Sequence, residues 1–179
     1  MLPIRIINAM REMNLRRDID LEQMHTHLPD SVYHRGRPQM LVIRMSNGRN
    51  LQIFRCGKIQ VLGNLSHFVM QSMCYEVVKK MRTLMPHLRL SPLTLKNIVV
   101  SVQLKMLVNL ANIKTSNHCI FYETELFPAA LIRKWHPVHI AVFHNGHCIM
   151  TGLRDISKVA DIVKSLMRYL YESQLIESC

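Results

Sequence analysis

Histidines and cysteines are the side chains of this 179-residue chain whose types could bind a metal ion or act in catalysis. They group as His25 with His27, His136 with His139, and His144 with His147 and Cys148. Strand alternation scatters these side chains over both faces of a sheet, and no second pair of ligands has the spacing of a structural zinc site. No nucleophile elbow, phosphate loop, HExxH motif or spaced pair of carboxylates stands out. The sequence therefore predicts no metal, no cofactor, no catalytic residue and no enzyme.

A second set of side chains could bind a partner, and its members occur in pairs. Every pair is separated by 89 positions: Asn8 and Asn97, Leu15 and Leu104, Tyr33 and Tyr122, Arg44 and Arg133, Phe54 and Phe143, Gly57 and Gly146, Gly63 and Gly152. A constant offset across amides, aromatic residues and glycines predicts two similar units that fill nearly the whole chain. We assign them to residues 1–90 and 91–179, joined by a short connection without a glycine or serine run.

The charge of the chain suggests what it binds. Its formal net charge is +11, and residues 1–90 hold 14 Lys and Arg against 6 Asp and Glu. Such an excess favours a polyanionic partner, with nucleic acid ahead of an acidic protein or a lipid surface. The five dispersed cysteines fit a reducing compartment, and neither a signal peptide nor a membrane span is expected. We therefore expect a soluble intracellular protein.

Two kinds of hydrophobic spacing predict the elements that position these pairs. Strict alternation over residues 97–104 predicts a strand with Ile98, Val100 and Val102 on the buried face, matched by a strand at 6–15. Further strands are predicted at 40–45, 51–54, 58–62 and 138–143, with turns at Asn47-Gly48, Cys56-Gly57, Pro128, Pro137 and Asn145-Gly146.

Helical spacing alternates with these strands. Short helices are predicted from Asp20 and from about Val108. Each unit should then close with an amphipathic helix, capped by Ser66 in the first unit and by Asp155 or Ser157 in the second. Each unit thus has the order strand, helix, four strands, helix. This order predicts an α+β fold in which helices cover only one face of a long antiparallel sheet and leave the other face open for a ligand.

These residues resemble the TATA-box-binding protein (TBP) family over nearly the full chain. The resemblance is carried by Leu95-Lys96-Asn97-Ile98-Val99, by the loop Tyr122-Glu123-Thr124-Glu125-Leu126-Phe127-Pro128, and by the matching positions of the first unit. It implies a saddle in which two pseudo-symmetric repeats form one long curved antiparallel sheet with helices on the convex face. It also implies a transcription initiation factor that binds double-stranded DNA in the minor groove of A·T-rich promoter elements and bends the duplex.

The resemblance assigns roles to individual residues. It implies that aromatic wedges enter base steps, that central amides meet the A·T acceptors beside apolar and hydroxyl contacts, and that cations clamp the backbone. The wedges are Phe54, Phe127 and Phe143, the amides Asn8 and Asn97, the adjoining contacts Val99, Ile149 and Thr151, and the cations Arg44, Lys58, Arg133 and His147.

The same resemblance implies a protein partner. Glu123, Glu125 and Leu126 match the residues with which the family recruits a TFIIB-type initiation factor, and through it the RNA polymerase machinery. A nuclear location follows if the source is eukaryotic or viral. Neither a membrane nor a small-molecule substrate is expected.

Three departures from the family pattern support an alternative. Pro38 occupies the position of a fourth wedge, Glu12 lies on the predicted DNA face, and His147 replaces a cation that is always charged. The alternative is a protein–protein adaptor of transcription that keeps the fold but has little or no specific DNA binding. A third hypothesis is a helix-grip or similar enzyme whose open face holds a small ligand.

Overall fold

The computed structural model describes residues 3–46, 48–113, 119–135 and 138–177. The chain divides into two compact units, a first unit of Asn8–Lys96 and a second unit of Met1–Ile7 with Asn97–Cys179. The division falls inside two strands, β1 (Ile4–Asn14) and β6 (Thr94–Gln103), so each strand contributes to both units. The bounds predicted for the two repeats, 1–90 and 91–179, stay a prediction, and the compact units do not coincide with them.

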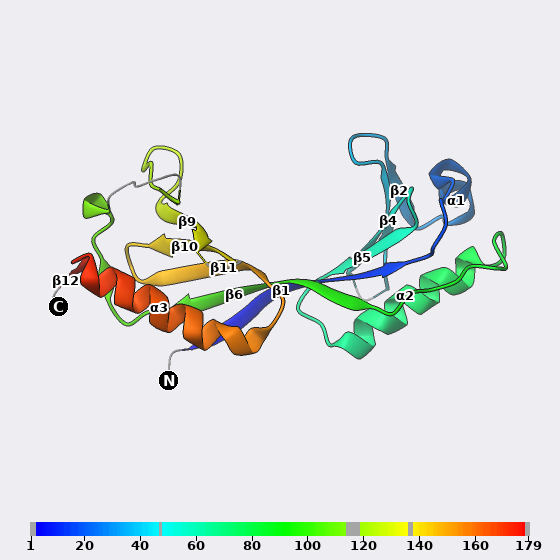
Figure 1. Ribbon diagram of the computed structural model, residues 1–179. Coiled ribbons are helices and arrows are strands. Elements are labelled where there is room, and N and C mark those ends of the chain that lie inside the picture. The colour runs from blue at the N-terminus through cyan, green and yellow to red at the C-terminus, as the bar shows by residue number, and fades with distance from the viewer. Residues whose placement is uncertain (1–2, 47, 114–118, 136–137, 178–179) are drawn as a thin grey trace. The chain divides into compact units, whose positions relative to one another are not determined.

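The first unit has the predicted order of strand, helix, four strands and helix (Figure 1). After β1 come α1 (Leu21–His27), β2 (Ser31–His34), β3 (Met40–Arg44), β4 (Asn50–Phe54), β5 (Lys58–Leu62) and α2 (His67–Met81). The strands form an antiparallel sheet in the order β2-β3-β4-β5-β1.

The second unit repeats the four-stranded meander and the closing helix. After β6 come β7 (Leu107–Val108), η1 (Leu110–Asn112), β8 (Ile120–Phe121), β9 (Ala129–Trp135), β10 (Val138–Phe143), β11 (His147–Leu153), η2 (Ile156–Lys158), α3 (Val159–Glu172) and β12 (Ile176–Glu177). Its sheet has the order β6-β11-β10-β9-β8, again antiparallel. No helix in the described part of the chain is long and apolar enough to cross a membrane.

The predicted helix from about Val108 is wrong. Val108 lies in β7 and pairs with Ile176 of β12, and among the described residues between β7 and β8 the only helical element is the 3-10 turn η1. Leu110 and Ile113 are nevertheless buried, as helical spacing had predicted. Pairing of β7 with β12 outweighs the local helical preference of this segment. A short apolar run in the sequence does not by itself distinguish a strand from a helix.

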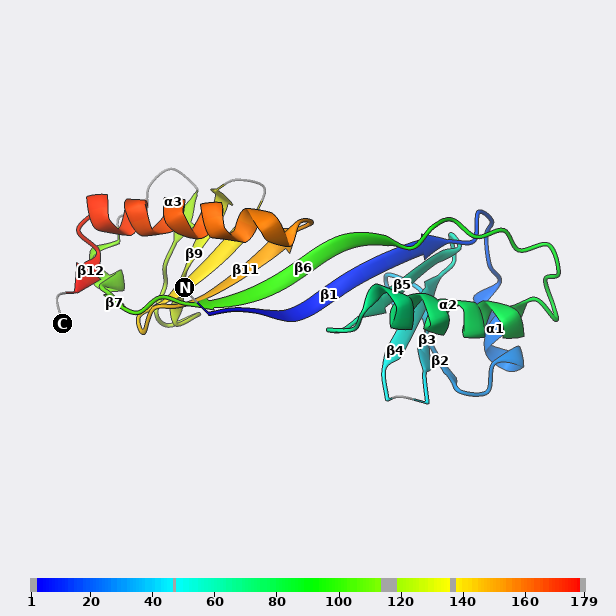
Figure 2. The ribbon, with the colours of Figure 1, turned by 90° about the horizontal axis from the view of Figure 1, so that it is seen from below.

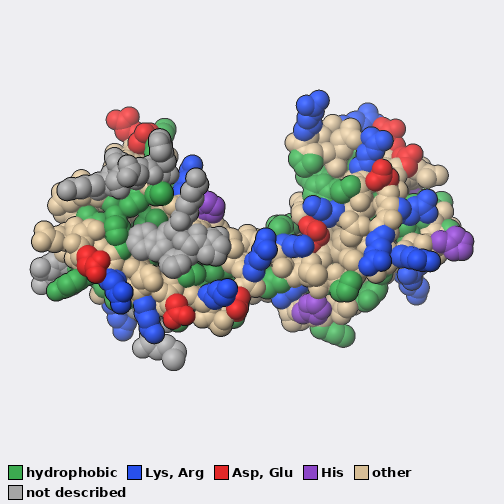
Figure 3. Space-filling model, in the orientation of Figure 1, with side chains coloured by type: hydrophobic (Ala, Val, Ile, Leu, Met, Phe, Trp, Pro, Cys, Tyr) green, Lys and Arg blue, Asp and Glu red, His purple; other side chains and the backbone are tan. Residues whose placement is uncertain are grey.

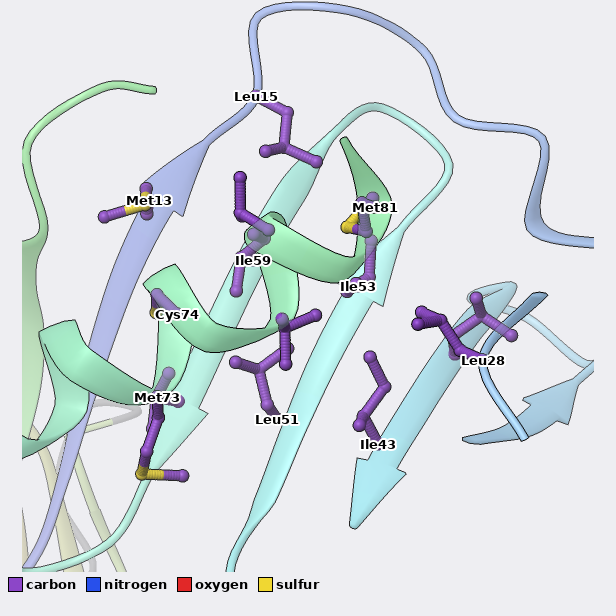
Figure 4. Close-up of a cluster of buried hydrophobic side chains, with 14 of the residues drawn as sticks. Met13, Leu15, Leu28, Ile43, Leu51, Ile53, Ile59, Met73, Cys74 and Met81 are labelled. Carbon is purple, nitrogen blue, oxygen red and sulfur yellow. The ribbon is translucent and has the colours of Figure 1, made fainter. Parts of the chain in front are cut away.

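The core of the first unit lies between its sheet and α2. Figure 4 shows Met73, Cys74 and Met81 of α2 lying against residues such as Leu51 and Ile59 of the sheet. Ser66 begins the helix as predicted, because its hydroxyl accepts a hydrogen bond from the backbone N–H of Val69. In the second unit α3 lies along one face of β9–β11 in the same way (Figure 2), with its buried stripe facing the sheet.

Two glycines fix the hairpin turns that carry the predicted binding residues. Gly57, before β5, and Gly146, before β11, both have φ near +75°. A Cβ atom at Gly57 would collide with the backbone carbonyl of Arg17, and one at Gly146 with the carbonyl of Met106. Glycine is therefore required at both turns for its left-handed conformation and for close backbone approach. The turns at Asn47 and Pro137 fall on residues outside the described part of the chain.

Strand alternation then sorts the side chains between two faces. Along β11, Cys148 and Met150 are fully buried beneath α3, whereas His147, Ile149 and Thr151 are half-buried on the opposite face. Along β5, Ile59 and Val61 are buried, while Lys58, Gln60 and Leu62 lie on the opposite face. We call this second face of each sheet, which none of the described helices covers, the open face.

Candidate nucleic-acid interface

Three rings meet on the open face of the second unit. Phe127, at the end of the loop before β9, meets Phe143 at the end of β10 edge to face, with 5.8 Å between ring centroids. The ring centroid of His147 lies 5.6 Å from that of Phe143. Phe127 is 42% exposed although it is a large apolar side chain. The cluster is therefore a partly exposed aromatic surface and not a part of the core.

The side chain of Asn97 has a defined orientation. Its Oδ1 accepts a hydrogen bond from the backbone N–H of Gly152, with 2.8 Å between the two atoms. This bond forms where the register of β6 with β11 shifts, between Met150 and Leu153, so the amide occupies a bulge in the ladder. Because the carbonyl oxygen is engaged, the two N–H groups of the amide remain as donors.

The surface beside Asn97 is mainly apolar. Val99 of β6, Ile149 of β11 and Thr151 are all half-buried on the open face. Ile149 pairs with Ser101 on one side and with Ala141 on the other. A half-buried apolar strip with few acceptors suits A·T pairs, because their minor-groove edge lacks the guanine amino group that would need an acceptor.

The open face of the first unit is more polar. Phe54 lies half-buried at the end of β4, opposite Met40, and Asn8 lies half-buried in β1. Pro38, which occupies the position corresponding to Phe127, is exposed between β2 and β3. The ammonium of Lys58 lies 3.5 Å from a carboxylate oxygen of Glu12. Only one large aromatic ring is thus present where the second unit has two.

The remaining cations lie at the margins of the two sheets. Arg44 ends β3 and Arg133 lies in β9, and both are exposed. Arg44 lies between the buried Ile43 and Met45, and Arg133 follows the buried Ile132, so both lie on the open face. Figure 3 shows Lys and Arg side chains spread over the first unit, in line with the larger positive charge of its sequence. Such positions suit contacts with a phosphate backbone, which fix orientation without reading sequence.

The loop from Tyr122 to Pro128 is acidic and exposed. Its chain turns where the N–H groups of Leu126 and Phe127 both donate to the carbonyl of Glu123. Figure 3 shows acidic side chains at the end of this loop, and Leu126 beside them is 73% exposed. Residues 122–126 line a surface hollow together with Ala111. The loop therefore exposes two carboxylates with the apolar side chain of Leu126 beside them.

The histidines make separate local contacts. Nε2 of His147 lies 2.8 Å from the hydroxyl of Ser101, and Nδ1 of His144 lies 2.9 Å from the carbonyl oxygen of Val108. Among the described residues, no group of three His, Cys, Asp or Glu side chains could hold a metal ion. His136, from one of the predicted pairs, lies outside those residues.

Comparisons with known proteins connect this geometry to a family. The model of the family "Transcription factor TFIID (or TATA-binding protein, TBP)" matches residues 3–84 and again residues 92–173. The chain belongs to the TATA-binding protein family. Its two matches to one model also confirm the two repeats inferred from the constant offset.

Individual members of the family cover almost the whole chain. The TATA-box-binding protein of Methanococcus vannielii is 29% identical, covering 94% of this chain and 98% of its own. That of Aeropyrum pernix is 27% identical, covering 97% and 87%. Among solved structures, Methanococcus jannaschii TBP matches with a TM-score of 0.75 and 25% identity over 94% of this chain and 98% of that one. The TBP-like α+β fold is therefore confirmed, and the chain is a TBP-type transcription factor.

Sequence reasoning missed the contacts that cross strands. Ser101 beside His147, and the two lysines around Glu12, come together only through strand pairing. The constant offset could have identified Ser101, because Ser101 lies 89 residues after Glu12 and is therefore its counterpart in the second repeat. The register needed to connect Glu12 with Lys58 is not visible in either strand alone.

Proposed function

We propose that this member of the TBP family binds duplex DNA in the minor groove at A·T-rich promoter elements, bends it, and recruits a TFIIB-type factor. The observation that carries the proposal is the pair Phe127 and Phe143. Two phenylalanines in contact on an uncovered sheet face are costly to expose to water unless something covers them. Apolar wedges that enter a base step and bend the duplex must be exposed in this way on a face that DNA can reach.

Sequence preference is supported by the surface around Asn97. The outward N–H groups of its amide can donate to adenine N3 or thymine O2, the acceptors that A·T pairs present in the minor groove. Val99 and Ile149 beside it offer no acceptor to the guanine amino group of a G·C pair. In the second unit an A·T pair is therefore favoured over a G·C pair.

The wedge role is tested by fluorescence-anisotropy binding to A·T-rich and G·C-rich duplexes at several salt concentrations. We expect tighter binding to the A·T-rich duplex and an affinity that falls steeply with salt, because cations on the protein displace counterions from phosphates. The double variant Phe127→Ala/Phe143→Ala should lose at least about tenfold in affinity, since each stacked base contributes roughly 1–3 kcal/mol.

Phe68→Ala is the matched control for this variant. Phe68 lies at the start of α2 and is 78% exposed, so its removal deletes a similar ring away from the open face. It should leave DNA affinity unchanged. Equal and weak binding to both duplexes, unaffected by Phe127→Ala/Phe143→Ala, would contradict the DNA-binding proposal.

Partner recruitment is supported by the exposed loop with Glu123, Glu125 and Leu126. A charge-reversing double variant, Glu123→Arg/Glu125→Arg, should abolish capture of a TFIIB-type factor while leaving binding of bare A·T-rich DNA intact. Separation of the two effects would assign the loop to the partner and the aromatic pair to DNA.

The second candidate is a transcription adaptor of the same fold without specific DNA binding. The ion pair of Lys58 with Glu12 favours it, because the carboxylate offsets a cation that would otherwise contact phosphate. For an adaptor, the loop variant should abolish partner binding while the aromatic variant changes nothing. The nuclear location expected from the sequence stays a prediction, which the archaeal relatives do not support.

A further inference from the structure

A polar row crosses the open face of the first unit. Glu12 of β1 lies directly opposite Gln60 of β5, which lies directly opposite Gln52 of β4. Cross-strand partners project to the same face, so the three side chains form a continuous row. The matching positions of the second unit, 89 residues further on, are Ser101, Ile149 and Ala141. The two units therefore present different chemistry at equivalent places.

The structure holds the Glu12 carboxylate in place from several sides. The amide Nε2 of Gln60 donates to Oε2 at 3.3 Å, and the ammonium of Lys58 lies 3.5 Å from the same oxygen. The ammonium of Lys96 lies 3.9 Å from Oε1, beyond hydrogen-bonding distance. Only 19% of the Glu12 side chain is exposed. Among the described residues no hydrogen bond reaches Oε1, which leaves that oxygen able to accept one.

The chemistry of the minor groove decides what could meet this oxygen. A·T pairs present only acceptors there, so an ionised carboxylate, which is itself only an acceptor, is repelled and loses hydration without compensation. A G·C pair adds the guanine N2 amino group, which is a donor. A hydrogen bond from this donor to a carboxylate is charge-assisted and stronger than one between neutral groups.

We propose that Glu12 determines sequence specificity by accepting a hydrogen bond from a guanine amino group, so that the first unit prefers a G·C pair within its half of the DNA site. This inference rests on the proposed minor-groove binding and refines it. Lys58 and Lys96 allow a carboxylate on this face, because two nearby cations offset its repulsion of phosphates. The second unit, with Ser101 and Ile149, keeps the preference for A·T.

The test moves a single G·C pair, in either orientation, through every position of an A·T-rich duplex. At each position guanine is also replaced by inosine, which lacks only the N2 amino group and leaves the rest of the pair in place. Comparing G·C with I·C therefore isolates the predicted donor. At one or two positions the protein should bind G·C about tenfold more tightly than I·C, the ordinary value of one good base contact.

Two variants test whether Glu12 produces the preference for G·C over I·C. Glu12→Ser introduces the residue of the equivalent position in the second unit and should bring the G·C to I·C ratio to about one. Lys58→Gln is the matched control, since it removes a neighbouring cation but keeps the acceptor. It should lower the affinity for both duplexes alike and leave the ratio unchanged. Circular dichroism and urea melts establish that both variants fold.

The outcomes separate this inference from the proposed function. Aromatic-dependent binding to A·T-rich DNA, with no position at which G·C exceeds I·C, would overturn the role of Glu12 and leave the minor-groove proposal standing. A ratio that survives Glu12→Ser would also overturn it. Absence of specific binding to any duplex of the series would overturn both.

Discussion

One hydrogen bond fixes the orientation of the side-chain amide of Asn97. The N–H of Gly152 occupies its oxygen, so the donors and not the acceptor are available on the open face. Asn8, its counterpart, lies in a regular ladder instead, because Gly63 exchanges both of its backbone hydrogen bonds with Ala9. The two central amides are therefore held differently, although they occupy equivalent positions in the sequence.

Asn97→Asp tests whether the donors matter. Aspartate keeps an oxygen for Gly152 but replaces the NH2 group by an acceptor that A·T pairs repel. We expect the affinity for an A·T-rich duplex to fall at least about tenfold, from the loss of one base contact of roughly 1–3 kcal/mol and from phosphate repulsion. Anisotropy titration measures the change.

Asn112→Asp is its control. Asn112 is exposed in η1, so the substitution adds the same charge outside the open face. Its affinity should change much less than that of Asn97→Asp. Equal losses in the two variants would mean that net charge, and not the amide of Asn97, produces the effect.

Among the elements, the 3-10 helix η2, which leads directly into α3, begins at Asp155. The carboxylate of Asp155 accepts hydrogen bonds from the backbone N–H and from the hydroxyl of Ser157, at 3.0 and 2.8 Å. These bonds, aided by the charge of Lys158, lower the pKa of Asp155 below its ordinary value. The predicted cap therefore lies one element earlier than expected, because Asp155 caps η2 and the N-cap of α3, Lys158, makes no side-chain cap hydrogen bond.

The lowered pKa predicts a dependence of stability on pH. Because the folded state holds the pKa of Asp155 below its unfolded value, its stabilising effect is fully present above about pH 4 and is lost as pH falls through the folded pKa. Asp155→Asn keeps an acceptor oxygen but cannot titrate. In urea melts the stability advantage of the natural chain over Asp155→Asn should be small at pH 7, because the group is exposed, and should shrink further below about pH 4.

Ser157→Ala provides an internal comparison. It removes the hydroxyl donor but keeps the backbone N–H, so the pH dependence due to Asp155 should be reduced and not abolished. A difference between the natural chain and Asp155→Asn that grows on acidification would contradict this account.

The elements also show what sequence could and could not predict. Alternation correctly placed Ile98, Val100 and Val102 on the buried face of β6, because a strand between helix and open face has a strict period of two. The helix expected from Val108 was wrong, because Val108 pairs with a strand near the C-terminus. The contacts of Glu12 with Lys58 and Lys96 were missed because strand register brings together residues that are distant in sequence. The binding roles themselves stay predictions.

At the scale of the whole molecule, buried thiols lie in each unit. Burial raises the pKa of Cys74, in α2, and of Cys148, in β11, to about 12. Cys56 and Cys119 are exposed, and all four are free thiols. Because the thiolate is the nucleophile, the two buried groups should be inert towards thiol reagents in the folded protein.

Thiol labelling tests whether the two units open together. With Cys56, Cys119 and Cys179 replaced by serine, Cys74 and Cys148 should react with Ellman's reagent at pH 8 only on unfolding. The strands β1 and β6 belong to both units, so we expect equal rates for the two thiols, resolved by mass spectrometry. Labelling of one at least about tenfold faster than the other would indicate independent opening of the units.

The division of β1 between the units has a consequence for synthesis on the ribosome. Ile4–Ile7 are synthesised before the unit Asn8–Lys96, yet they belong to the unit that otherwise begins at Asn97. The unit Asn8–Lys96 is complete much earlier and can fold behind them. Ile4–Ile7 must therefore wait for the rest of their unit until the residues from Asn97 onward have been synthesised.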